Sequence, residues 1–144
     1  MIEVPAAVWH IERIASLVDF FSIGTNDLCQ YIMAADRGNS RVAAIANPFD
    51  PAVLRAIKHT ADAVHAAGGT VGMCGEMAGD PAATALLLGL GIDELSMSTP
   101  RIPEVKAVIR ELQLSRAQQV AAEVLACHSA FEVQSQLREA FVAT

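Results

Sequence analysis

Short apolar runs alternate along the chain with longer stretches in which apolar residues recur every three or four positions. The runs at residues 19–23, 70–73 and 94–97 have the length and composition of strands. Asp-Pro pairs at 50–51 and 80–81 are typical helix starts, because aspartate caps the first turn and proline fits the position after it. Strands that alternate with helices predict an α/β fold built on a parallel sheet.

The amino-terminal residues predict the end of a strand followed by one helix. Met1–Glu3 has the character of a strand stump, and Pro5–Val18 carries apolar residues at helical spacing after a proline suited to a first turn. Counting the stump, the chain has four predicted strands. Ile102-Pro103 marks another helix start after the last strand.

After Leu114 the alternation stops. Ser115 with Gln118, and Ser129 with Glu132, fit the capping-box pattern and predict two helices with no strand between them. No internal repeat, low-complexity run or long linker interrupts the chain. We therefore expect one domain that ends in a helical tail.

Charge and cysteine content narrow the classes of function. The net charge is -6, and acidic and basic residues are interspersed, which argues against a nucleic-acid partner or an anionic membrane surface. No apolar run reaches the length of a membrane span and the amino terminus does not resemble a leader, so we expect a cytoplasmic protein. Cys29, Cys74 and Cys127 form no CxxC pair, which favours reduced thiols over a disulfide framework or a zinc site.

Polar residues follow the first two predicted strands, where function collects in parallel sheets. Glu3 and Asp27 could face a shared pocket and hold a hard cation such as Mg2+, or be a terminal residue and a helix cap. Thr25 and Asn26 are equally compatible with capping. Arg37 lies in a polar turn, where it could clamp a phosphate or simply be solvated.

Cys74 carries a sharper signal. It follows an apolar strand and is flanked by glycines, which would let a substrate approach the backbone closely. A thiol there could be a nucleophile, which needs a nearby base, or a general acid, since an ordinary thiol is protonated at neutral pH. No histidine is near in sequence, which favours the acid; a buried structural cysteine is the alternative.

Two long motifs, in order and at matching spacing, favour the functional alternatives for these residues. GTNDLCQYIMAADRGN at 24–39 and GMCGEMAGDP at 72–81, with MIEVPAA at 1–7 and DELSMS at 93–98, resemble the phosphoenolpyruvate (PEP)-utilising enzyme family. The resemblance covers nearly the whole chain. ADRGN and GMCGEMAGD are more similar to enzyme I of the sugar phosphotransferase system than to pyruvate phosphate dikinase or PEP synthase, which stay as alternatives.

The resemblance implies a role for each candidate residue. Glu3 and Asp27 match the family's Mg2+ ligands. Asn26, together with Asp27, and Arg37 match residues that bind the substrate, the arginine at its phosphate. Cys74 matches the cysteine that protonates the methylene carbon of enolpyruvate, in agreement with the general-acid reading.

The resemblance also implies a fold and partners. We expect residues 1–144 to form the carboxy-terminal half of a (β/α)8 barrel, in a Mg2+-dependent phosphotransferase that moves a phosphoryl group from PEP to a protein histidine, with a phosphocarrier protein as partner. The histidines of the chain fit no phosphoacceptor motif, and half of the phosphate-binding side of the barrel is missing, so the isolated chain should be inactive. A half barrel would leave open strand edges and apolar strand faces, so we expect a homo-oligomer, and a non-catalytic self-association module is one alternative function. A nonfunctional remnant is another alternative.

Overall fold

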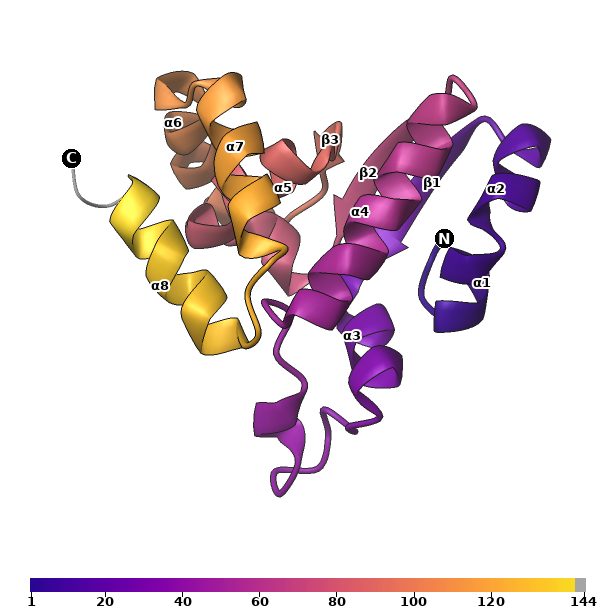
Figure 1. Cartoon of the computed structure of the whole chain (residues 1–144), viewed down its shortest axis with the longest axis horizontal. Coiled ribbons are helices and arrows are strands. Elements are labelled where there is room, and N and C mark those ends of the chain that lie inside the picture. The colour runs from indigo at the N-terminus through magenta and orange to yellow at the C-terminus, as the bar shows by residue number, and fades with distance from the viewer. Residues whose placement is uncertain (142–144) are drawn as a thin grey trace.

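The computed structural model describes residues 1–141, which form a parallel sheet with helices packed on one side of it (Figure 1). The strands are β1 (Phe20–Gly24), β2 (Thr70–Cys74) and β3 (Glu94–Leu95), in that order and all parallel. A parallel bridge between Ile2 and Ile23 adds the amino-terminal segment beside β1. Strands that follow one another across the sheet in chain order confirm the α/β fold and its arrangement as part of a (β/α) barrel.

The first predicted helix is broken. It consists of α1 (Pro5–Trp9), α2 (Ile11–Ile14) and a 3₁₀ turn (Ala15–Leu17), because His10 leaves helical geometry at φ -103° and ψ 7°. The single helix predicted from residue 5 to residue 18 is therefore wrong in its continuity. Periodicity could not reveal the break, since His10 is exposed and the buried positions continue at spacings of three and four on both sides of it.

The predicted Asp-Pro helix starts are confirmed. The helices that cover the sheet or continue from it are α3 (Thr25–Met33), α4 (Pro51–Ala66) and α5 (Pro81–Leu90). Asp50 and Asp80 each accept a hydrogen bond from the backbone N–H two residues on, at 2.8 and 2.9 Å. Gly91 ends α5 in the left-handed region at φ 98°, which disfavours other residues. Short 3₁₀ turns occur at Ala43–Ile45, Glu76–Gly79 and Thr99–Arg101.

The carboxy-terminal part is helical, as predicted, but one cap differs. It comprises α6 (Ile102–Glu111), α7 (Leu114–Val124) and α8 (Ala130–Phe141). The capping box at Ser115 is wrong, because the bond from Ala117 N to the Gln113 carbonyl places Ser115 inside the first turn. At α8 the pattern holds: Glu132 N donates to Ser129 Oγ at 3.2 Å, and the Glu132 carboxylate accepts from the backbone N–H of His128.

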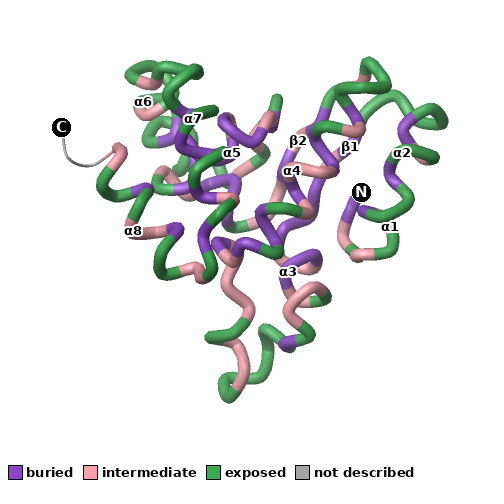
Figure 2. Tube along the Cα trace, in the orientation of Figure 1, coloured by how far each residue is buried: buried purple, intermediate pink, exposed green. Residues whose placement is uncertain are grey.

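Buried residues alternate with more exposed ones along most of β1 and along β2, as the purple and pink segments of these strands show (Figure 2). Phe21, Ile23, Val71 and Met73 are buried beneath the helices and form the centre of the hydrophobic core. The alternate positions point to the other face, where side chains are small or polar apart from Phe20, which is 71% exposed. The expectation that a half barrel leaves apolar strand faces open is wrong for the valine and isoleucine side chains of β1 and β2, because the helices of the chain cover them, and it holds only for Phe20 among the residues of these two strands.

Candidate functional site

The carboxyl ends of the strands place Glu3 and Cys74 on either side of Gly24. Gly24 is the register partner of Cys74, and its backbone N–H donates to the carbonyl of Ile2 at 2.9 Å. A Cβ atom added to Gly24 would lie only 2.7 Å from both Cγ and Oε1 of Glu3. The absence of a side chain at Gly24 thus makes room for the Glu3 carboxyl group at this edge of the sheet.

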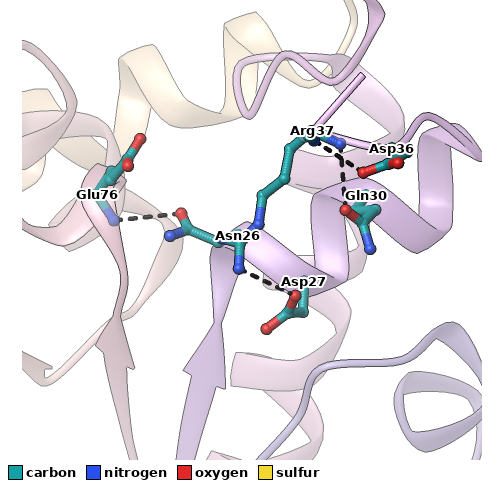
Figure 3. Close-up of polar contacts among 7 residues, drawn as sticks. Asn26, Asp27, Gln30, Asp36, Arg37 and Glu76 are labelled. Atoms are coloured by element: carbon teal, nitrogen blue, oxygen red, sulfur yellow. Dashed lines mark hydrogen bonds and ion pairs between the residues drawn. The ribbon is translucent and has the colours of Figure 1, made fainter. Parts of the chain in front are cut away.

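The turn that follows Cys74 is tied to the start of α3. Thr25 Oγ1 donates to the Cys74 carbonyl at 3.0 Å, and Asn26 Oδ1 accepts from the backbone N–H of Glu76 at 3.3 Å (Figure 3). Gly75 between them has φ 101°, which a residue with a Cβ rarely adopts. Because Asn26 uses its amide oxygen on the turn, its amide N–H groups are the ones left to donate to another molecule.

Arg37 reaches back over α3 toward Asp27 (Figure 3). Arg37 Nη2 lies 3.6 Å from Asp27 Oδ1, and the two side chains are 54% and 40% exposed. The backbone N–H of Arg37 donates to Gln30 Oε1 at 3.2 Å, and Ala34 ends the helix in the left-handed region. These contacts hold the loop so that the arginine faces the amino-terminal end of α3.

Cys74 is the most accessible of the three thiols. Its Sγ donates to the Ile23 carbonyl at 3.6 Å and lies 3.6 Å from Sδ of Met1. Cys29 and Cys127 are buried, and burial is the main cause that raises the pKa of both thiols, with Asp50 adding to the effect at Cys29. Cys74 alone among them is open to chemistry at the carboxyl edge.

The five residues predicted for the site lie at this edge of the sheet. Three separate contacts connect them: Glu3 faces Cys74 across Gly24, Asn26 binds the turn after Cys74, and Asp27 lies near Arg37. The sequence left the role of Thr25 open, with capping as one alternative, and did not predict its bond to Cys74. It also overlooked Gln30, which holds the Arg37 loop. Thr25 could have been singled out because it is a polar residue directly after a strand. No feature of the sequence around Gln30 indicates its contact with the Arg37 loop.

Two carboxylates at this edge match the donor chemistry of Mg2+. This ion takes oxygen ligands and is usually held by one or two carboxylates together with substrate oxygens and water. Glu3 and Asp27 supply oxygen donors of that kind, and the space at Gly24 accommodates the Glu3 carboxylate. Among residues 1–141, no group of three or more His, Cys, Asp or Glu side chains is arranged so that it could hold a metal ion.

A cavity of about 800 Å³ lies away from this edge, between α5, α6 and α8. Its lining is mostly apolar, and none of the five candidate residues belongs to it. Size alone would make it the first choice for a ligand site. The strand ends are the better candidate, because the polar and reactive side chains converge there.

None of the helices in the part of the chain that the structure describes is long and apolar enough to cross a membrane.

Comparison with known proteins identifies similar sequences over most of the chain. The profile of the family described as PEP-utilising enzyme, PEP-binding domain, matches residues 1–114. Two proteins named phosphoenolpyruvate-protein phosphotransferase are 50% identical over 141 residues, in Geobacillus stearothermophilus, and 53% identical over 133 residues, in Haloferax volcanii. They match 98% and 92% of this chain. A multiphosphoryl transfer protein of Escherichia coli is 45% identical over 137 residues, or 95% of this chain.

The chain is much shorter than these relatives. It spans 24% of the length of the two phosphotransferases and 16% of the multiphosphoryl transfer protein.

Proposed function

The chain belongs to the PEP-utilising enzyme family, and from that premise we propose that it is the carboxy-terminal part of a PEP-binding barrel that serves phosphoryl transfer to a protein histidine. Residues 1–144 would all belong to this one, truncated domain. The observation that carries the proposal is the row formed by Glu3, Gly24 and Cys74, which sets a carboxylate and an accessible thiol at the same edge of the sheet.

Cys74 would complete the reaction by protonating carbon. When PEP loses its phosphoryl group, the P–O bond breaks and its electrons stay on the enolate of pyruvate, while a histidine nitrogen of the acceptor forms the new P–N bond. The enolate carbon C3 then takes the proton of the Cys74 thiol, forming a C–H bond. The thiolate left behind regains a proton from solvent.

Arg37 and Asn26 would bind the substrate. The guanidinium of Arg37 presents several N–H donors in one plane, which suits a phosphate, and its loose 3.6 Å contact with Asp27 leaves it free to rotate toward one. The amide N–H groups of Asn26 would donate to a substrate oxygen, while its Oδ1 stays on the Glu76 backbone. Asn26 projects from the start of α3, and Arg37 reaches toward the same end from the loop that follows the helix (Figure 3).

Glu3 and Asp27 would hold Mg2+ through carboxylate oxygens. Bound there, the ion would neutralise negative charge on substrate oxygens. Asp27 Oδ1 already lies near the Arg37 guanidinium, so both positive groups would share this carboxylate. Asp27 would bind the substrate from the same position, through the ion that its carboxylate holds.

The acceptor histidine would come from elsewhere. His65 pairs with Asp93 at 2.8 Å, and His59 lies beside Trp9 with the ring centroids 5.6 Å apart and the ring planes tilted by 43°. His65 lies at the opposite end of α4 from its start at Pro51, far along the helix from the carboxyl ends of the strands. A histidine of another part of the enzyme and a phosphocarrier protein are the partners that we propose.

The names of the relatives favour phosphoenolpyruvate-protein phosphotransferase over pyruvate phosphate dikinase or PEP synthase. Sugar transport is the pathway that we propose. The cytoplasm is the proposed compartment, because Cys29, Cys74 and Cys127 are free thiols and reducing conditions preserve them.

We also propose that the chain self-associates as a homo-oligomer, for instance a dimer. Its sheet has two outer strands, the Ile2 segment and β3, and Phe20 is 71% exposed on the uncovered face. Unpaired strands of this kind pair readily with another chain. Sedimentation should give an assembly at micromolar concentration, and a monomer would contradict this proposal.

The proposed function can be tested in a chimaera in which this chain replaces the 141 matching residues of the Geobacillus stearothermophilus relative. The chimaera should release pyruvate from PEP in the presence of Mg2+ and a phosphocarrier protein, and the isolated chain should not. A folded chimaera without this activity would contradict the proposal.

A further inference from the structure

The three buried threonines of the described chain use their hydroxyl groups differently. Thr25, Thr60 and Thr84 are each at most 1% exposed. Thr60 and Thr84 donate to the carbonyl four residues earlier in their own helices, at 2.8 and 3.1 Å. Thr25 instead donates to the carbonyl of Cys74, a residue 49 positions away, at 3.0 Å. Thr25 therefore joins two elements where the other two act within one.

The hydroxyl of Thr25 is diverted from its own helix. Thr25 is the first residue of α3, one position after the N-cap Gly24, which has no side chain with which to cap the helix. A Cβ added to Gly75 would lie 2.6 Å from Thr25 Oγ1. The hydroxyl thus occupies the space that a side chain at Gly75 would need, and only a glycine allows the contact.

A second bond fixes the same turn two residues later. Glu76 N donates to Asn26 Oδ1, so the backbone is held at the Cys74 carbonyl by Thr25 and at the Glu76 N–H by Asn26. The two ties come from consecutive residues at the start of α3. They fix the place of the Cys74 backbone relative to the helix that carries Asn26 and Asp27.

We infer that Thr25 is a positioning residue for Cys74: its buried hydroxyl holds the strand end that carries the thiol in register with the residues at the start of α3. The inference rests on the proposed role of Cys74 as proton donor. Proton transfer to carbon requires the donor close to the acceptor atom, and rates of such steps are sensitive to small displacements. Thr25 does not contact the substrate in this account and acts through Cys74.

The first test measures backbone hydrogen exchange in the folded chain, which is independent of any activity. Thr25→Val keeps the shape of the side chain and removes the hydroxyl, and Thr25→Ser keeps the hydroxyl. Thr60→Val is the matched control, because it removes an equally buried hydroxyl far along α4. Exchange at the Glu76 N–H should be faster in Thr25→Val only. Equal exchange in Thr25→Val and Thr60→Val would overturn the inference.

The second test measures kcat, KM and the solvent deuterium isotope effect on kcat for PEP in the chimaera. Thr25→Val should lower kcat by roughly 10- to 100-fold with little change in KM, because the displaced donor slows only the proton transfer. The solvent deuterium isotope effect on kcat should increase in the same variant. Thr25→Ser should restore both values, and Thr60→Val should leave both unchanged.

Cys74→Ala separates the two claims. A kcat that Thr25→Val leaves unchanged, beside a strongly reduced kcat in Cys74→Ala, would overturn the positioning role and leave the proposed function in place. An unchanged kcat in Cys74→Ala would overturn the proposed function and the inference together.

Discussion

Arg55 on α4 donates two hydrogen bonds, from Nε and Nη2, to the backbone carbonyl of Leu125 at 3.2 and 2.8 Å. Leu125 is the C-cap residue directly after α7, where carbonyl groups have no partner within the helix. One arginine of the barrel portion thus caps a helix of the carboxy-terminal tail. A positive side chain at this end also complements the helix dipole.

Arg55→Met should loosen the contact between the tail and α4. The methionine keeps most of the aliphatic stem but not the two donors, so the free energy of unfolding should fall by about 1 kcal/mol. Urea denaturation of the chain measures this. Lys58→Met, which removes an exposed ion pair with Asp62 on the same helix, should change stability by less than about 0.5 kcal/mol. Equal effects of the two changes would contradict the capping role.

Gly89 lies at a close approach between α5 and α7. A Cβ added there would lie 2.3 Å from the Ala117 carbonyl oxygen and 2.9 Å from the Ala121 Cβ. Gly89→Ala should therefore destabilise the chain by about 1–3 kcal/mol, although alanine is the better helix former. Gly72→Ala is the control, since its nearest new contact would be an ordinary 3.5 Å to Glu94. Thermal unfolding should show a loss for Gly89→Ala only, and a stable Gly89→Ala protein would mean that the helices are not packed in this way.

Burial, aided by Asp50, raises the pKa of Cys29 from an ordinary value of 9.0 to about 11. Between these values the unfolded chain loses the thiol proton while the folded chain keeps it, so ionisation favours the unfolded state. Stability should be intact below pH 9 and decline as the pH rises toward 11. Cys29→Ala should make the decline shallower, with Cys127 retaining a contribution of the same sign. Denaturation midpoints, measured between pH 9 and pH 11 for the wild type and for Cys29→Ala, give the comparison. If the midpoints of the two proteins fell with pH at the same rate, the account of a buried Cys29 thiol would be wrong.

Asp27→Asn and Glu3→Gln remove one proposed anionic ligand each, so the chimaera should need at least about tenfold more Mg2+ for half-maximal activity in either variant. Glu94→Gln serves as the control, because it removes an exposed carboxylate from β3, which is adjacent neither to β1 nor to the segment that carries Glu3. Titration of activity with Mg2+ gives the comparison. Superimposable curves for the wild type and either ligand variant would rule out the metal assignment.

The sequence predicted the parts of the fold that local chemistry determines. Asp50 and Asp80 predicted the starts of their helices through capping, and the short apolar runs at 19–23 and 70–73 predicted β1 and β2. The break at His10 could not be predicted, because the apolar spacing continues across it. Motif order placed the candidate site residues at strand ends. The bond between Thr25 and Cys74 was out of reach, since it joins residues 49 positions apart and depends on how two strand ends meet.

The central claim is that Cys74 delivers the proton that turns the enolate into pyruvate. Pyruvate release from PEP by the chimaera, measured for the wild type and Cys74→Ala at saturating PEP and Mg2+, tests it most directly. The substitution should lower kcat at least about 100-fold while PEP still binds, because the thiol acts on the enolate and not on the bound substrate. Pyruvate release by Cys74→Ala at the wild-type rate would contradict the account.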